Sequence, residues 1–219
     1  SGMICSEREL NISDEHEGIM VLPNDLTIGD DFMSAYGHKF ISLELDITPN
    51  RPDAFSHQGI ARDISSVTRR KFSPTTAEPV NRNDKFTFNI KIDSLEDCPR
   101  YIGGIIQNVK TGPSPNWLVD RLRSIGQRSI NNIVDISNYV LMEIGHPTHI
   151  FDLDKISRKE ILVRRAKNGE SLTTLDEQEH ELNNKHLLIT DGMEPIALAG
   201  VMGGLNSAVT ESTTSLLVE

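Results

Sequence analysis

Residues 112–156 read GPSPNWLVDRLRSIGQRSINNIVDISNYVLMEIGHPTHIFDLDKI, and the two helices that this stretch predicts set the frame for the rest of the chain. Ser114 and Pro115 precede NWLVDRLRSIG, which predicts an N-cap, a first-turn proline and a helix closed by Gly126. The following apolar residues recur with a helical period, which predicts a second helix that ends at Gly145. This stripe consists of Ile133, Ile136, Val140 and Ile144.

Short apolar runs lie on both sides of the two helices. After them come ILVRRA (161–166), SLTTL (171–175), HLLIT (186–190), PIALA (195–199) and SLLV (215–218), which predict strands separated by loops. Before them, ISLELDIT (41–48), FTFNIKI (86–92) and RYIGGIIQNV (100–109) predict further strands, and residues 54–71 predict a helix.

These patterns predict an α+β protein in three parts. Residues 1–40 lack a sustained period and are expected to be irregular. Residues 41–84 form a small strand-helix portion whose polar end, SPTTAEPVNRND (73–84), is a linker. Residues 85–219 form a mixed, sheet-rich domain. Because the chain stops directly after the apolar SLLV, we expect it to be an internal piece of a longer protein.

Composition limits the classes of function. No apolar run approaches the roughly 20 residues of a membrane helix, so we expect no membrane partner. Two isolated cysteines, Cys5 and Cys98, fit a reducing cytoplasm. The net charge of -10 argues against a broad grip on a phosphate backbone, although a pocket for the end of a nucleic acid remains open. Basic clusters occur at residues 69–71, 121–128 and 164–167 and are either solvated faces or nucleic-acid contacts.

Most familiar catalytic patterns are missing from the sequence. There is no phosphate-binding P-loop, and AGVMGG (199–204) indicates either a tight turn or a loop whose amides face a ligand. His146 and His149 frame HPTHIFD, but the proline between them disfavours the helical spacing of a metal site, so we predict no metal. Ser137 is a conceivable nucleophile with His149 as its base, without a nucleophile elbow to support it. Asp135 could cap a helix or form an ion pair.

Longer motifs carry a resemblance. LDITPNRPDAFSHQGIARDIS (45–65) resembles a stretch of the bacterial phenylalanyl-tRNA synthetase beta chain, and residues 112–156 resemble the editing domain of that family. GESLTTLDEQE (169–179) and PIALAGVMGG (195–204) resemble it too, and SGMICSERELNI (1–12) looks like the end of a tRNA-binding-type domain.

The resemblance implies a cytoplasmic α2β2 enzyme that charges tRNA(Phe), with ATP and magnesium used by the full synthetase and no cofactor in this piece. Aminoacylation then belongs to the alpha subunit. The editing domain is similar to a hydrolase that accepts the 3′ end of mischarged Tyr-tRNA(Phe). A non-catalytic tRNA-binding or subunit-scaffold region is the alternative.

The resemblance also implies site residues. Glu219 and the amide of Gly203 match the groups that recognise the tyrosine hydroxyl. His149 matches a residue that contacts the terminal adenosine or positions water. The implied pocket wall consists of Ser137, Asn138, Pro147, His149, Ala199 and Gly200. If this reading is right, Ser137, Asn138, His149 and Gly203 should meet at one cleft.

Overall fold

The computed structural model describes residues 3–10, 12, 16–22, 24, 26–35, 40–80, 86 and 88–219. The chain divides into two compact units, Ser1–Ile41 and Ser42–Glu219. The first unit is irregular where it is described, apart from one helical turn, α1 (Phe32–Ala35). The predicted boundary near residue 84 and the assignment of residues 1–40 to a tRNA-binding-type domain stay predictions.

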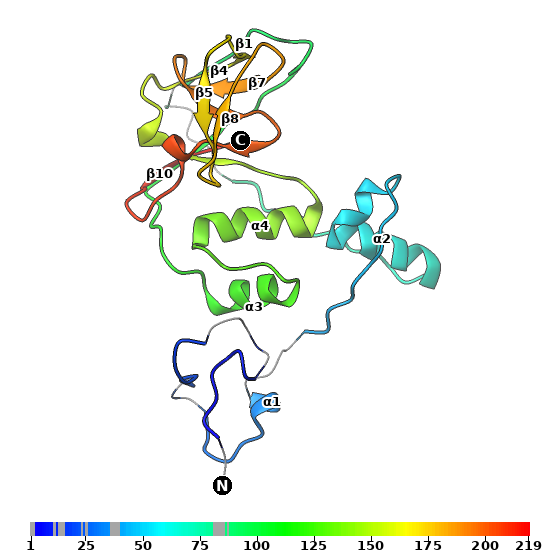
Figure 1. The fold of residues 1–219 in the computed structure, drawn as a ribbon. Coiled ribbons are helices and arrows are strands. Elements are labelled where there is room, and N and C mark those ends of the chain that lie inside the picture. Colours follow the sequence, from blue (N-terminus) through cyan, green and yellow to red (C-terminus); the bar gives the residue numbers. More distant parts are fainter. Residues whose placement is uncertain are drawn as a thin grey trace. The chain divides into compact units, whose positions relative to one another are not determined.

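Three sheets build the second unit (Figure 1). The largest has the order β1-β4-β7-β8-β9, formed by Asn89–Ile92, Glu160–Arg165, Leu187–Thr190, Pro195–Leu198 and Met202–Gly203. Its β1 and β4 are parallel and the other pairs are antiparallel. This mixed sheet, together with the helices, confirms the predicted α+β class.

The second sheet brings distant parts of the chain together. β10 (Ser215–Val218) lies between β2 (Gly104–Gln107) and β3 (Ile150–Asp152), antiparallel to both. A small hairpin pairs β5 (Ser171–Thr173) with β6 (Glu179–Glu181).

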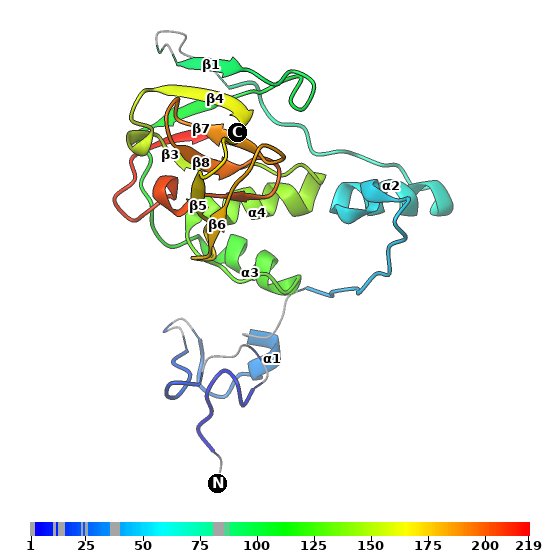
Figure 2. The ribbon, with the colours of Figure 1, turned by 45° about the horizontal axis from the view of Figure 1, so that its top comes forward.

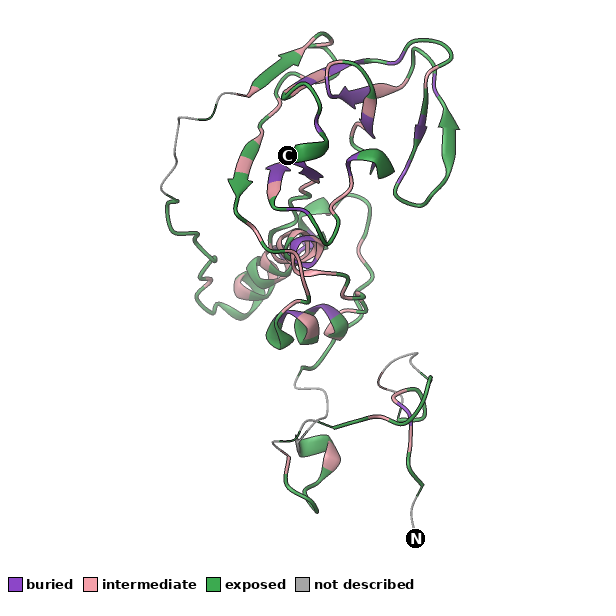
Figure 3. Cartoon of the chain, turned by 90° about the vertical axis from the view of Figure 1, so that its left-hand side faces the viewer, coloured by how far each residue is buried: buried purple, intermediate pink, exposed green. Residues whose placement is uncertain are grey.

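The apolar core lies between the first two sheets. Figure 3 shows the buried residues gathered in this strand-rich body. The central cluster consists of Phe151, Leu153, Ile156, Ile161, Val163, Ile189, Ile196, Ala197 and Leu217. β4 contributes alternate side chains, Ile161 and Val163, as expected where one face of a strand is covered, whereas β8 contributes the neighbours Ile196 and Ala197.

Both helices of the opening stretch form as predicted. α3 (Asn116–Ser124) buries Leu118 and Leu122, one helical turn apart, and α4 (Asn132–Ile144) ends at Gly145 with a φ of 78°. Glycine adopts this left-handed conformation without steric cost. Figures 1 and 2 show α4 between α3 and the strands.

Two local predictions at these helices were wrong. Pro115, not Ser114, is the N-cap of α3, and it makes no side-chain cap. The Ser114 hydroxyl instead donates to Asp135, at 2.5 Å. Asp135 is fully buried and forms no ion pair with a described residue; it accepts three hydrogen bonds, also from the Ser129 hydroxyl at 2.6 Å and the Ile130 amide at 2.9 Å. This carboxylate therefore ties the α3–α4 connection to α4.

The segment before the linker also differs from the prediction. Residues 41–48 form no strand, and three of their four alternating apolar side chains, Ile41, Leu43 and Leu45, are exposed, with Ile41 at 94%. The predicted helix is divided into a 3₁₀ turn (Pro52–Phe55) and α2 (His57–Thr68), which begins at the Ser56 cap. Residues 73–80 of the expected linker lack regular structure, and residues 81–84 lie outside the described residues. The short 3₁₀ turns η2 (Leu153–Lys155) and η3 (Leu205–Ser207) complete the unit.

Candidate functional site

The pairing of β3 with β10 continues one step beyond both strands. The amide of Glu219 donates to the carbonyl of His149 at 2.8 Å, and the amide of His149 donates to the carbonyl of Glu219 at 3.3 Å. This reciprocal pair holds two of the predicted site residues opposite each other.

The imidazole of His149 lies directly on Gly203, a buried residue of β9. A Cβ at Gly203 would stand 2.2 Å from Cε1 and 2.5 Å from Nε2 of that ring, so the close approach requires glycine. The ring also packs edge-on against Phe151, with centroids 4.4 Å apart. Burial lowers the pKa of His149, which therefore favours the neutral imidazole at neutral pH.

The Glu219 side chain accepts a hydrogen bond from a phenol. The Tyr101 hydroxyl donates to Oε2 of Glu219 at 3.0 Å. Burial raises the pKa of the Glu219 carboxyl, and the hydrogen bond from Tyr101 offsets part of that rise. Burial, with the nearby Glu219 charge, also raises the pKa of the Tyr101 phenol far above its ordinary value. Sequence reasoning missed Tyr101 because nothing in RYIGGIIQNV marks this tyrosine.

Two more predicted residues come from α4. The Ser137 hydroxyl donates to the carbonyl of Thr148 at 2.9 Å and lies 2.9 Å from the Thr148 hydroxyl. This contact connects α4 to the residue next to His149. Asn138 follows on the same helix and is half-buried; within the described part of the chain its amide makes no hydrogen bond. Because the Ser137 hydroxyl is bonded to Thr148, the structure provides no support for a Ser137–His149 nucleophile pair.

The other residues of the predicted wall differ in position. Pro147 is exposed on the segment between α4 and β3. Ala199 packs against the apolar core, and its amide donates to the carbonyl of Leu187 at 3.0 Å. Gly200 is exposed, in the turn between β8 and β9, with a φ of 70°. The structure therefore joins His149, Gly203, Glu219 and Tyr101 directly and Ser137 through Thr148; for Asn138, Pro147, Ala199 and Gly200 a role in the site stays a prediction.

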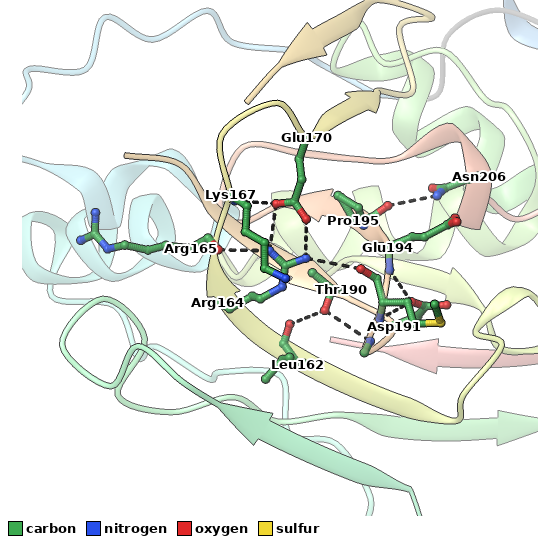
Figure 4. Close-up of polar contacts among 12 residues, drawn as sticks. Leu162, Arg164, Arg165, Lys167, Glu170, Thr190, Asp191, Glu194, Pro195 and Asn206 are labelled. Atoms are coloured by element: carbon green, nitrogen blue, oxygen red, sulfur yellow. Dashed lines mark hydrogen bonds and ion pairs between the residues drawn. The ribbon is translucent and has the colours of Figure 1, made fainter. Parts of the chain in front are cut away.

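The basic cluster at residues 164–167 is not a free cationic face. Arg164 is buried, and its guanidinium donates to both carboxylate oxygens of Glu170, at 2.7 and 2.9 Å. Arg165 pairs with Asp97 at 2.5 Å. Figure 4 shows Glu170 facing Arg164, with the amide of Lys167 donating to the same carboxylate at 2.6 Å.

A cavity of about 390 Å³ lies beside this ion pair. Residues 170–173, residues 193–195 and Asn206 line it, so none of the predicted site residues contributes to its wall. In the described ranges, no three His, Cys, Asp or Glu side chains come together as a metal site. No helix of the described chain is long and apolar enough to cross a membrane.

Comparisons with known proteins agree with the motifs. The model of the B3/4 domain matches residues 97–219. Phenylalanine–tRNA ligase beta subunits match the whole chain: those of Syntrophotalea carbinolica (43% identical), Geobacter sulfurreducens (46%) and Dehalococcoides mccartyi (47%). The chain spans 27 to 28% of the length of these relatives.

Among solved structures, an N-terminal fragment of the phenylalanyl-tRNA synthetase beta subunit from Pyrococcus horikoshii matches with a TM-score of 0.45 and 17% identity. The match covers 77% of this chain and 52% of that one. The sequence comparisons confirm the family identified from the motifs: the chain belongs to the B3/4 domain family, in the form carried by phenylalanine–tRNA ligase beta subunits.

Proposed function

We propose that this chain is the editing portion of a phenylalanine–tRNA ligase beta subunit and hydrolyses the ester of Tyr-tRNA(Phe). The observation that carries the proposal is the Glu219 carboxylate, which accepts a phenolic hydroxyl at 3.0 Å beside a histidine packed on Gly203. Buried carboxylates with a raised pKa are found preferentially at functional sites, because burial of a charge costs stability.

Editing is needed because tyrosine differs from phenylalanine by one hydroxyl. An apolar pocket rejects an added hydroxyl only modestly, by about 100-fold in the analogous case. A second site can select in the opposite direction when it requires that hydroxyl. Phenylalanine in such a site leaves one acceptor position without the donor that tyrosine provides, at a cost of about 1–3 kcal/mol.

Each residue of the candidate site has a separate role in the proposed hydrolysis. Glu219 accepts the hydroxyl of the tyrosyl group, and the amide of Gly203 is the second candidate for that contact. A neutral His149 can donate to one partner and accept from another, which suits it to hold a water molecule or the terminal adenosine. Asn138, whose amide is not bonded to the described chain, is available to the ester end of the substrate.

The remaining activities of the ligase are assigned elsewhere. Aminoacylation would use ATP and magnesium in an α2β2 enzyme of the cytoplasm, in which the alpha subunit carries that reaction. The residues described here do not fit those groups, because they offer neither a metal cluster nor a lysine-bearing phosphate loop. We therefore derive no step through ATP or magnesium for this chain.

A non-catalytic role in holding tRNA or the alpha subunit is the second candidate. It is favoured by Trp117, an exposed indole that lies 5.5 Å from the Arg121 guanidinium and packs edge-on against Tyr139. Such an aromatic-arginine group is suited to stacking on a base.

The test compares ester hydrolysis of Tyr-tRNA(Phe) and Phe-tRNA(Phe) by the intact ligase that contains this chain. We expect selective loss of the tyrosyl ester, and a decrease of about 10- to 100-fold for His149→Ala. His146→Ala is the matched control, because His146 is exposed three residues earlier. Equal hydrolysis of both esters, or none, would leave the non-catalytic role as the better account.

A further inference from the structure

The Tyr101–Glu219 hydrogen bond joins residues 118 positions apart. β2 begins three residues after Tyr101, and β10 ends one residue before Glu219. These strands are antiparallel, with Val218 opposite Gly104, so the sheet itself brings the two side chains to one end. The two side chains of this bond therefore lie just beyond the paired ends of β2 and β10, in positions that the strand pairing brings together.

The aromatic ring of Tyr101 is held in place as well as its hydroxyl. Its ring packs against the central apolar cluster, and both Tyr101 and Glu219 are partly buried. A phenol anchored in this way cannot leave the carboxylate without giving up apolar packing. Displacement of Tyr101 by an incoming substrate is for that reason disfavoured.

The carboxylate still has room for a second donor. An ionised carboxylate offers two oxygens with about four acceptor positions, and the described contact uses Oε2. The last torsion of a glutamate side chain is broad, so a carboxylate without a partner samples many orientations. One held at a single oxygen presents the other oxygen in a defined direction.

We propose that Tyr101 is a positioning residue for substrate selection: it holds one oxygen of Glu219 so that the other accepts the hydroxyl of the substrate's tyrosyl group. The inference rests on the proposed editing function. It assigns to Tyr101 a part in recognising the side chain of the substrate and no part in breaking the ester bond.

A role in binding the side chain, without a role in breaking the ester, predicts how KM and kcat change. The tyrosyl hydroxyl lies at the end of the side chain remote from the ester, so its contact is present in the bound substrate and in the transition state alike. Loss of such a uniform contact raises KM and leaves kcat unchanged.

Tyr101→Phe in the intact ligase is the test, because it removes one oxygen and keeps the ring that packs on the core. We expect the KM for Tyr-tRNA(Phe) hydrolysis to rise about tenfold, the size of a lost hydrogen bond involving a charged group, with kcat within about twofold. Hydrolysis of Phe-tRNA(Phe) should not change. Thr111→Val is the control, since it also removes one hydroxyl, which donates to the carbonyl of Thr213 at 3.1 Å and does not contact Glu219.

A double-mutant cycle with Glu219→Gln separates positioning from general damage. If Tyr101 acts through the carboxylate, Tyr101→Phe should have a much smaller effect in the Glu219→Gln background. An equal effect in both backgrounds, or a parallel fall of kcat for both esters, would overturn the inference. An unchanged KM for Tyr101→Phe would do the same.

The proposed function and the role of Tyr101 are contradicted by different results. If the unmodified ligase shows no preference for the tyrosyl ester, the proposed function fails and the inference with it. If the preference is present and Tyr101→Phe preserves it, the proposed function stands and the role of Tyr101 is rejected.

Discussion

Replacement of Gly203 by alanine tests how the His149 ring is held. The three heavy atoms nearest to an added Cβ all belong to the imidazole, the closest at 2.2 Å. Real Cβ atoms do not come that close to a neighbour, so the ring must move. Its movement is restricted by an edge-on contact with Phe151, at a centroid distance of 4.4 Å.

The expected cost follows from this geometry. Inserting one methyl group into a packed site costs about 1–3 kcal/mol. The lower part of that range applies here, because the group that must move is the end of a side chain and not backbone. In a His149→Ala background the added methyl group meets no ring, so its cost should vanish. We therefore expect a coupling free energy of about 1–2 kcal/mol between the two positions.

Urea unfolding of the four variants measures this coupling. Trp117 is the single tryptophan of the chain and belongs to the same compact unit as Gly203 and His149, so its fluorescence reports on the relevant transition. Gly112→Ala is the matched control, because a Cβ there has no neighbour within 4 Å and needs no positive φ. If Gly203→Ala costs the same with and without the His149 ring, the proposed packing is refuted.

Three further predictions concern charged groups. Asp135→Asn should lower the free energy of unfolding by about 2–3 kcal/mol, because the fully buried carboxylate accepts three hydrogen bonds and an amide cannot accept all of them. Urea unfolding followed by Trp117 fluorescence measures this loss of stability. Glu170→Gln should cost about 1 kcal/mol at pH 7, since solvent screens this partly exposed pair. The hydrogen bond from Arg164 lowers the pKa of Glu170 in the folded protein, so the pair stabilises the fold above the pKa that Glu170 has in the unfolded chain. This stabilisation is lost as the pH falls through the lowered pKa of the folded state. Urea unfolding measured at a series of pH values that shows no such loss would contradict the prediction. Burial raises the pKa of Glu219, so wild-type stability should fall as the pH rises through that raised value, and Glu219→Gln should remove this dependence in thermal melts between pH 4 and pH 8.

Sequence periodicity predicted the elements that are long or deeply buried. Both helices of residues 112–145 and the strands β4, β7, β8 and β10 produce strong local patterns, and each of them buries side chains, although Ile136 and Ile144 of the α4 stripe are exposed. ISLELDIT shows the same alternation and yet forms no strand, since a strand also needs a neighbour to pair with and these residues pair with no described part of the chain. The strands β3, β6 and β9 are too short for alternation to be visible.

Residues of the candidate site could be predicted only where they belong to a motif that resembles the family. Recognition of the family marked Glu219, Gly203 and His149, which the structure brings together. Tyr101 could not be found in this way, because its importance depends on a partner 118 positions away and on the register of β2 with β10. Local sequence contains no information about such a pairing until the sheet is known.

The central place of β10 has a consequence for synthesis on the ribosome. Until residues 215–218 emerge, β2 and β3 have no common neighbour, and the main-chain groups that pair with β10 are left open. Open strand edges are sites of misassociation, and contacts between distant residues form slowly because a large loop must close first. Arrival of this strand closes the sheet and places Glu219 beside Tyr101 in the same event. A nascent chain shorter than that point thus lacks both the middle strand of this sheet and the carboxylate that Tyr101 contacts, so completion of the sheet and assembly of the candidate site coincide.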